Sequence, residues 1–439
     1  MNPIAKELNA ILEAANPELM GMLSATGRSL FFPKGILSQS AEAKVRATKI
    51  NATIGIAKEE GRTMRFDSVA RHISGIAPRD SLTYAPSFGI PELRKTWKDA
   101  LYRKNPSLAG KTISLPVVTN GITHGISTFG EVWLDPGDVV ILPEMMWGNY
   151  NLILGLRRGA RVSHYDLFTA AGGFNLDAFE AVVKKEAAVN EKIAVLLNFP
   201  QNPSGYTATE AEGRRIAEIL TDAAEQGTRV LAVFDDAYFG LFYDPATLQE
   251  SLFARLCDAH PRLLAVKLDG ATKENYVWGL RVGFITYGCP MIGDAAAAYD
   301  ALERKTAGDI RGTISNASHL GQSIVLKSMQ SPEYAEEQQA KYRLLKARAD
   351  RVRTVLANPA YADAWEAYPF NSGYFMCLRL KTVDAETLRV HLLDHYGVGL
   401  IALGERNLRV AFSCIDEAEV EELFDIVHRG IRDLTGQGT

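Results

Sequence analysis

Between about residues 115 and 290 the chain alternates short apolar runs with stretches of helical periodicity, and this alternation limits the folds it can adopt. The apolar runs cover residues 115–119, 139–142, 193–198, 230–234, 263–268 and 282–287. Regular alternation of strands and helices is typical of a mostly parallel sheet with helices packed on it. Ligands of such sheets bind at the carboxyl ends of the strands, so the residues that follow each run are the candidates for a functional site.

The run 263–268 is followed by Lys273, and Arg281 comes eight residues later, just ahead of the run 282–287. A lysine at the end of a buried strand is poorly solvated and loses its proton more easily, and a neutral amine can attack a carbonyl to form a Schiff base. An arginine nearby could hold a phosphate by paired hydrogen bonds. Taken alone the spacing is weak evidence, because most such pairs are solvated surface charges.

Three other strand ends carry residues that suit a flat heteroaromatic ligand. Asn202 lies in a tight N-P-x-G turn and could offer a side-chain donor. The Asp235 carboxylate could hold a proton on a ring nitrogen while the Tyr238 hydroxyl reaches a ring oxygen, although a strand-end aspartate often only caps the next helix. Trp147 could stack on a flat ring, or it could be a core residue.

Two further segments could bind anions. Residues 119–125 join a strand to a helix, and the backbone N–H groups of such a turn suit a phosphate, although a generic turn has the same pattern. Arg409 lies between the apolar strand residues Leu408 and Val410. Its side chain points either outward to solvent or inward toward a substrate carboxylate.

Composition excludes several function classes. The net charge is -4 and no cluster of lysine and arginine occurs, so binding to nucleic acid or to a membrane surface has no support. Cys257, Cys289, Cys377 and Cys414 lie far apart, which predicts reduced thiols rather than a metal cluster or a disulfide framework. Residues 1–22 do not read as a signal peptide, and no window approaches the ~18 apolar residues of a membrane span. We expect a cytoplasmic enzyme.

The pattern changes toward the C-terminus. After Ser331-Pro332, which suit a helix start, a long helix is expected, followed by short strands and helices that form a smaller α+β unit. We therefore expect a large ligand-binding domain at residues 61–325 and a small domain at residues 326–439. Residues 1–60 are expected to pack with the small domain.

Taken together, N-P-x-G, D-x-A-Y, a strand-end lysine and an arginine eight residues later resemble the pyridoxal-phosphate-dependent aminotransferases of fold type I. More narrowly, the chain is similar to the aspartate/aromatic aminotransferase branch of class I/II, over residues 50–427. The resemblance implies an α/β fold: a large domain with a mostly parallel seven-stranded sheet flanked by helices, plus a smaller α+β domain. It implies pyridoxal 5'-phosphate as the cofactor and no metal.

The resemblance also assigns roles to the residues around the cofactor ring. Lys273 would be the Schiff-base lysine and proton shuttle, and Asp235 would pair with the pyridinium nitrogen, which keeps the ring an electron sink. Tyr238 and Asn202 would hold the phenolic oxygen. Trp147 would stack on the ring.

A second group of residues would hold the phosphate and the substrate. The phosphate would be bound by Gly121, Ile122, Thr123 and Arg281. Arg409 would bind the substrate α-carboxylate, and Gly55 would line the substrate pocket with Asn202 and Trp147.

Two residues are expected to act across a subunit interface. Tyr84, in a segment similar to the family's intersubunit loop, would reach the phosphate of the neighbouring subunit, which implies a homodimer. Arg311 matches the arginine that crosses to a substrate side-chain carboxylate, which favours aspartate or glutamate, although it could be only a surface residue. Aromatic substrates stay open, because the aromatic-specific members keep the same arginine.

Two features depart from the family pattern. Gly270 stands where a phosphate-binding serine is usual, so that one hydroxyl contact is missing and either Thr272 or water replaces it. His124 has no role that the resemblance explains.

The implied reaction is ping-pong transfer of an amino group from an amino acid to a 2-oxo acid. A lyase or a decarboxylase would bind the cofactor with the same residues, so the sequence leaves these activities open. A cofactor-binding regulator without turnover has less support, because the chain has no appended DNA-binding segment and its net charge is acidic. A nicotinamide-dependent dehydrogenase is weaker still, since no G-x-G-x-x-G follows any of the predicted strands.

Overall fold

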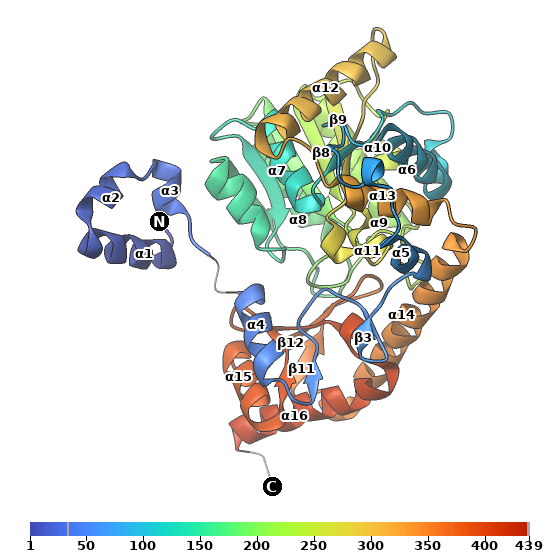
Figure 1. Cartoon of the computed structure of the whole chain (residues 1–439). Helices are drawn as coiled ribbons and strands as arrows, with labels where there is room; N and C mark the ends of the chain where they lie inside the picture. Colours follow the sequence, from blue (N-terminus) through green and yellow to red (C-terminus); the bar gives the residue numbers. More distant parts are fainter. Residues whose placement is uncertain (33–34, 437–439) are drawn as a thin grey trace.

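A computed structural model of the chain describes residues 1–32 and 35–436 (Figure 1). Its largest element is a seven-stranded sheet in the order β4-β10-β9-β8-β7-β5-β6. The strands are β4 (Val117–Thr119), β5 (Val139–Pro143), β6 (Arg161–Tyr165), β7 (Lys192–Asn198), β8 (Arg229–Asp235), β9 (Leu263–Gly270) and β10 (Gly283–Gly288). Only β10 runs antiparallel to its neighbours, β4 and β9, so the sheet is mostly parallel.

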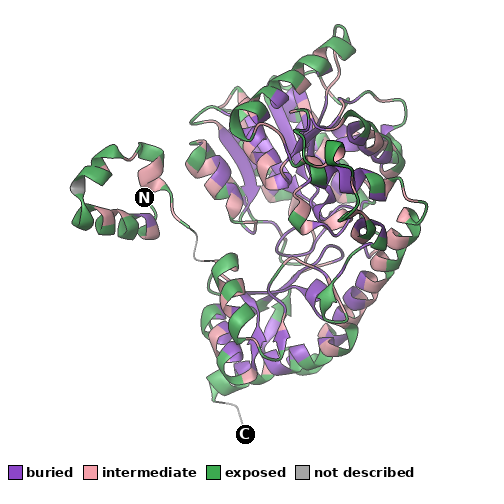
Figure 2. Cartoon of the chain, in the orientation of Figure 1, coloured by how far each residue is buried: buried purple, intermediate pink, exposed green. Residues whose placement is uncertain are grey.

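The strands of this sheet are apolar because helices cover them. β4 and β5 are buried along their whole length, and the sheet lies inside the purple core of Figure 2. A parallel sheet covered on both faces needs near-continuous apolar strands. The helices of this unit are α5 (Asp67–His72), α6 (Pro91–Lys104), α7 (Ile122–Trp133), α8 (Leu176–Ala187), α9 (Glu210–Glu225), α10 (Phe253–Leu256), α11 (Ala271–Glu274), α12 (Ala295–Thr313) and α13 (His319–Met329).

Helix α9 illustrates how local sequence sets these elements. The Thr209 hydroxyl accepts a hydrogen bond from the Glu212 backbone, and the Glu212 carboxylate accepts one from the Thr209 backbone at 2.7 Å, which together form a capping box. One face of the helix is buried on the sheet and carries Ile216, Ile219, Leu220 and Ala223.

The C-terminal part forms a smaller unit around a four-stranded antiparallel sheet in the order β11-β12-β15-β14. Its strands are β11 (Trp365–Ala367), β12 (Met376–Leu380), β14 (Ile401–Leu403) and β15 (Asn407–Val410), and its helices are α14 (Tyr334–Leu356), α15 (Ala385–Tyr396) and α16 (Val420–Thr435). The predicted fold class, a mostly parallel seven-stranded sheet flanked by helices with a smaller α+β unit, is confirmed.

The N-terminal segment divides between the two units. The sequence places all of residues 1–60 with the smaller unit, and α4 (Ile36–Arg46) and β1 (Ile50–Asn51) do pack there, since β1 pairs with β13 (Val398–Gly399). By contrast, α3 (Ala25–Ser29) packs against the π-helical segment η3 (Asn151–Arg157) of the large unit.

The remaining N-terminal elements complete the description. Helices α1 (Pro3–Ala15) and α2 (Pro17–Met22) pack together with α3, and the three helices form a group at one side of the chain in Figure 1. A short hairpin pairs β2 (Lys58–Glu59) with β3 (Arg62–Thr63). Residues 33–34 and 437–439 of the predicted domains lie outside the described residues.

Three general properties bear on function. Within the described ranges, every helix falls short of the length or the apolarity that a bilayer crossing requires. The four cysteines are free thiols. No group of three or more His, Cys, Asp or Glu side chains among the described residues is arranged to hold a metal ion.

Candidate active site

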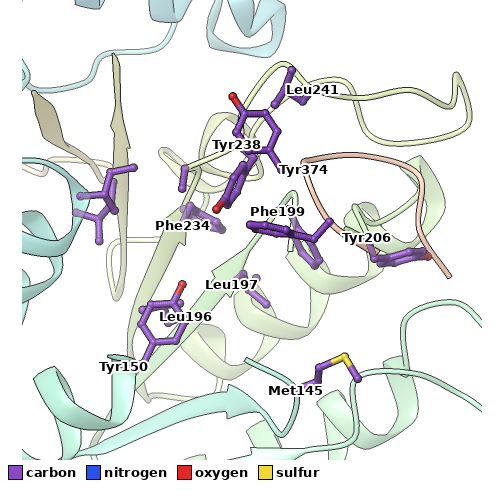
Figure 3. Close-up of a cluster of buried hydrophobic side chains, with 14 of the residues drawn as sticks. Met145, Tyr150, Leu196, Leu197, Phe199, Tyr206, Phe234, Tyr238, Leu241 and Tyr374 are labelled. Atoms are coloured by element: carbon purple, nitrogen blue, oxygen red, sulfur yellow. The ribbon is translucent and has the colours of Figure 1, made fainter. Parts of the chain in front are cut away.

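Side chains from several strand ends surround one cavity at the carboxyl edge of the large sheet. Figure 3 shows aromatic residues gathered near it: Tyr238 lies against Tyr374 close to the end of the strand that carries Phe234, and Tyr150 lies lower in the view. The cavity is lined by Ile122, Thr123, Trp147, Tyr150, Asn198, Asn202, Asp235, Ala237, Tyr238, Thr272, Lys273 and Arg281.

Lys273 lies on the short helix α11, which begins directly after β9. Its Nζ is 4.7 Å from the centre of the Tyr238 ring. Loss of solvation lowers the pKa of Lys273 to about 8, although the negative charge of Asp235 opposes this change, and Arg281 adds to it. At pH 7 about one molecule in ten therefore carries the neutral amine, far more than for an ordinary lysine with a pKa of about 10.4, and this neutral form is a nucleophile and a base.

Asp235 is the last residue of β8 and is 3% exposed. The Tyr150 hydroxyl donates to its Oδ2 at 2.5 Å, and the Ala237 N–H donates to its Oδ1 at 3.2 Å. Burial raises the pKa of Asp235 to about 6, while the Tyr150 hydrogen bond and the Lys273 charge act in the opposite direction. The carboxylate is thus fixed and mostly ionised at neutral pH, as a partner for a protonated ring nitrogen must be.

The N-terminus of α7 and Arg281 together form an anion site. Gly121 precedes α7 with a φ of 77° and supplies no side-chain cap, so the first N–H groups of the helix stay free for a ligand. A side chain at Gly121 would lie 2.5 Å from Nη2 of Arg281, so only glycine lets the guanidinium come this close. No described carboxylate forms an ion pair with Arg281.

Gly270 cannot carry the serine that the family usually has, because the backbone of β10 lies too close. A Cβ at Gly270 would be 2.7 Å from the Val282 carbonyl oxygen and 2.9 Å from the Gly283 Cα. Thr272, two residues later, lines the cavity, and its buried Oγ1 has no hydrogen-bond partner among the described residues. The missing hydroxyl is therefore available from Thr272.

Replacing Gly270 with serine is expected to lower the free energy of unfolding by about 1–3 kcal/mol, because β10 must shift to accept the side chain. Urea denaturation would measure the change. The matched control is Gly279→Ser, since a Cβ at Gly279 meets nothing within 4 Å. Equal stability of the two variants would contradict the steric explanation.

Arg409 extends from β15 of the smaller unit and is 2% exposed. Its Nη2 donates to the Thr53 carbonyl at 2.7 Å, its Nη1 donates to Asn202 Oδ1 at 3.1 Å, and its guanidinium lies 4.2 Å from the centre of the Phe375 ring. Among the described residues, its Nε has no hydrogen-bond partner and no carboxylate forms an ion pair with this arginine. A buried cation without a counter-ion is costly unless an anionic ligand completes it.

The low pKa of Lys273 predicts how its reactivity depends on pH. The rate of reductive methylation of Lys273 by formaldehyde should rise with pH, with its midpoint near pH 8, because only the neutral amine reacts. Asp235→Asn should shift this midpoint to a lower pH, since the substitution removes the negative charge that stabilises the ammonium form of Lys273. Peptide mass spectrometry across the pH range would measure both. A midpoint near that of an ordinary lysine, about 10.4, would contradict the prediction.

A family model described as aminotransferase class I and II matches residues 47–427. The chain belongs to this family. An aspartate aminotransferase of Rhizobium meliloti (strain 1021) is 30% identical over 254 residues, which cover 54% of this chain and 57% of that protein. An aspartate/prephenate aminotransferase of Cereibacter sphaeroides is 26% identical over 363 residues, or 76% of this chain and 80% of that one. The chain thus spans little more than half the length of the first of these relatives.

Solved structures of aminotransferases have the same fold. An aminotransferase from Anaerococcus prevotii superposes with a TM-score of 0.82 at 23% identity, covering 93% of this chain and 98% of that one. An aspartate aminotransferase from Thermus thermophilus, crystallised with maleate, gives a TM-score of 0.71 at 18% identity, covering 93% and 99%.

Most of the residues that the resemblance assigns lie at or beside the cavity in this member of the aminotransferase class I and II family, and Arg409 reaches it through its contact with Asn202. Eight of them line the cavity: Ile122, Thr123, Trp147, Asn202, Asp235, Tyr238, Lys273 and Arg281. Gly121 borders Arg281, and Gly55 lies next to Tyr238, whose hydroxyl oxygen would be 3.5 Å from a Cβ at that glycine. Tyr84 and Arg311 are exposed and do not line the cavity of their own chain.

Sequence reasoning missed several cavity residues. Tyr150 lies three residues after Trp147, a helical spacing that could have placed both side chains at the same site. Asn198, at the end of β7, donates to the Asp235 carbonyl oxygen at 2.7 Å. His124, for which the sequence offered no role, does not line the cavity: its Nδ1 accepts the Asn120 N–H at 3.1 Å in the turn before α7.

Proposed function

We propose that this chain is a pyridoxal-phosphate-dependent aminotransferase that moves an amino group from an amino acid to a 2-oxo acid by a ping-pong mechanism. The observation that carries the proposal is the Lys273 amine, whose pKa of about 8 leaves it reactive between the Asp235 carboxylate and the anion site of Arg281. Membership of the class I and II aminotransferases supports it further.

The cavity residues fit pyridoxal 5'-phosphate. The phosphate would be held by Arg281, by the free N–H groups at the start of α7 and by the Thr272 hydroxyl, which otherwise lacks a partner. Asp235 would hold the proton of the pyridine nitrogen, and Trp147 would cover a face of the ring. When bound, the cofactor supplies an electron-withdrawing ring that stabilises negative charge on the substrate α-carbon.

The protein's own groups would supply the proton transfers. The neutral Nζ of Lys273 takes the proton from the substrate Cα and holds it for return. Asp235 keeps its position and charge through the Tyr150 hydroxyl. Burial raises the pKa of Tyr238, so its hydroxyl stays protonated and would donate a hydrogen bond to a ligand in the cavity, which Asn202 also lines.

Substrate recognition would rest on arginines. Arg409 would bind the α-carboxylate as the missing counter-ion of its buried guanidinium, with Gly55 leaving space beside it. Arg311 of a neighbouring subunit would bind a side-chain carboxylate, which favours aspartate or glutamate, and an aromatic amino acid is the other candidate. The name of the Rhizobium meliloti relative, an aspartate aminotransferase, supports the dicarboxylic substrate.

The active form would be a homodimer. Tyr84 is 89% exposed and its neighbour Leu82 is 82% exposed, which is expected of residues that meet a second copy of the chain. Tyr84 would contact the phosphate bound by the other subunit. The free cysteine thiols support a cytoplasmic location.

Product analysis would test the proposed reaction. The purified protein with pyridoxal phosphate would be incubated with aspartate, glutamate, tyrosine or alanine, and with 2-oxoglutarate or oxaloacetate as acceptor. Transfer predicts equal amounts of the new oxo acid and the new amino acid. Release of ammonia or carbon dioxide instead would identify a lyase or a decarboxylase on the same scaffold.

A further inference from the structure

A buried lysine that the proposed reaction does not use pairs with Asp236, the residue that follows Asp235 of the cavity. Lys267 belongs to β9 and has an exposed fraction of 0%, so its ammonium group is fully removed from water. A charge in such a position is very costly unless other groups compensate it. The groups around Lys267 therefore have to compensate its positive charge.

Two acidic side chains compensate Lys267. Its Nζ forms an ion pair with Asp236 Oδ2 and lies 3.8 Å from Asp269 Oδ2, and its third neighbour is the Phe239 ring, 4.7 Å away at the centre. Asp236 also accepts the Ser251 hydroxyl at 2.6 Å. Both carboxylates raise the pKa of Lys267, so it stays protonated.

The two carboxylates are not equivalent. Asp236 receives the Lys267 ammonium and the Ser251 hydroxyl on the same oxygen. Asp269 accepts only the Trp97 indole N–H, at 3.1 Å, and its Oδ1 has no partner among the described residues. Burial raises the pKa of Asp269 to about 6. Asp236 is thus the principal counter-ion of Lys267.

This ion pair adjoins the proposed catalytic carboxylate in the chain. Asp236 follows Asp235, yet only Asp235 lines the cavity, because Asp236 is turned toward Lys267. The negative charge of Asp236 raises the pKa of Asp235. The Lys267 ammonium pairs with that charge, and an opposite charge beside a carboxylate weakens its effect on neighbouring groups.

We infer that Lys267 is a positioning residue of the active site: by pairing with Asp236 it holds the turn after β8 and allows the neighbouring Asp235 carboxylate to keep its charge in the cavity. The role of Asp235 as a partner of the cofactor nitrogen rests on the proposed function. The effect of Lys267 on the charge of Asp235 does not depend on a bound cofactor.

The other groups that face Asp235 act from the cavity side. They are the Tyr150 hydroxyl before η3, the Lys273 amine on α11 and the Tyr238 hydroxyl after β8. None of them contacts Lys267 within the described residues. A change at Lys267 therefore reaches Asp235 through Asp236 and the turn that both share.

The test is the titration of Asp235 in the full-length protein without added cofactor, followed by pH-difference infrared spectroscopy of carboxyl groups. The band that disappears in Asp235→Asn is assigned to Asp235. Lys267→Met should move the midpoint of this band up from about 6 by about one pH unit, since Asp236 is left uncompensated. Asp236→Asn should move it down, because Lys267 stays and the neighbouring negative charge is gone.

Two results of this titration would distinguish a positioning role of Lys267 from general damage to the fold. The single variants shift the midpoint in opposite directions, and Lys267→Met/Asp236→Asn, which removes both charges, should return it close to the wild-type value. If Lys267→Met does not fold, Asp236→Asn and the double variant still give the comparison. Midpoints that stay unchanged, or that shift in the same direction in both single variants, would overturn the inference.

Cofactor affinity gives a second readout. At pH 6.5, a rise of one unit in the pKa of Asp235 reduces its ionised fraction about threefold, so Lys267→Met should bind pyridoxal phosphate about threefold more weakly than the wild type, and at pH 8.5 the difference should vanish. A wild-type protein that binds no pyridoxal phosphate would refute the proposed function, while the infrared titration would still decide the role of Lys267.

Discussion

Lys273→Ala is expected to abolish transamination. The variant loses the only amine that lines the cavity among the described residues, and with it both the nucleophile and the group that moves the substrate proton. General acid–base catalysis alone is worth about 10²–10⁴-fold in rate, so the loss should be at least of this size. Oxo acid formation under single-turnover conditions would measure it, because slow product release cannot mask the chemical step there.

The control for this variant is Lys184→Ala. Lys184 lies on α8 with its side chain 64% exposed, so its replacement should leave the rate unchanged. Addition of a small primary amine should restore part of the activity of Lys273→Ala, since the missing base is then supplied from solution. Turnover of Lys273→Ala near the wild-type level would refute the assignment of Lys273.

Arg409→Gln should be the second most damaging replacement. It removes the buried guanidinium that we propose as the partner of the substrate α-carboxylate, while the Asn202 and Thr53 oxygens that it contacts lose their donor. Loss of one partner of a buried charged pair costs about 2–5 kcal/mol, which corresponds to about 30- to 5,000-fold in kcat/KM. Most of the effect should appear in KM, because the carboxylate is bound before the reaction begins.

Two variants sharpen this prediction. Arg406→Gln is the matched control, since Arg406 lies three residues earlier on the same hairpin and is exposed. Arg409→Lys should also lose much of the activity, because an ammonium group cannot reproduce the paired hydrogen bonds of a guanidinium. An unchanged KM for Arg409→Gln would show that the α-carboxylate binds elsewhere.

The sequence was sufficient to predict the central sheet because buried strands have to be apolar. The six predicted runs correspond to β4, β5, β7, β8, β9 and β10. Strand β6 (Arg161–Tyr165) was not among them, since it lies at the sheet edge and only its last residue is buried. An edge strand of this kind has no apolar run to identify it.

The candidate site was predictable where chemistry follows a strand end. Asp235 and Lys273 each come after a buried run, and the structure brings them to one cavity. The role of Lys267 was not predictable, because a single lysine inside an apolar run gives no indication of an acidic partner, and Asp236 follows the end of the neighbouring strand β8. The unpaired Oγ1 of Thr272 likewise depends on how closely β10 approaches Gly270.

The most direct test of the proposed function is the visible absorption spectrum of the purified protein with pyridoxal phosphate, recorded before and after addition of single amino acids. We expect a cofactor band that is absent in Lys273→Ala and that bleaches with aspartate or glutamate, or with an aromatic amino acid, and returns on addition of a 2-oxo acid. A protein that forms no such band with pyridoxal phosphate would contradict the assignment of Lys273, Asp235 and Arg281 to a cofactor site.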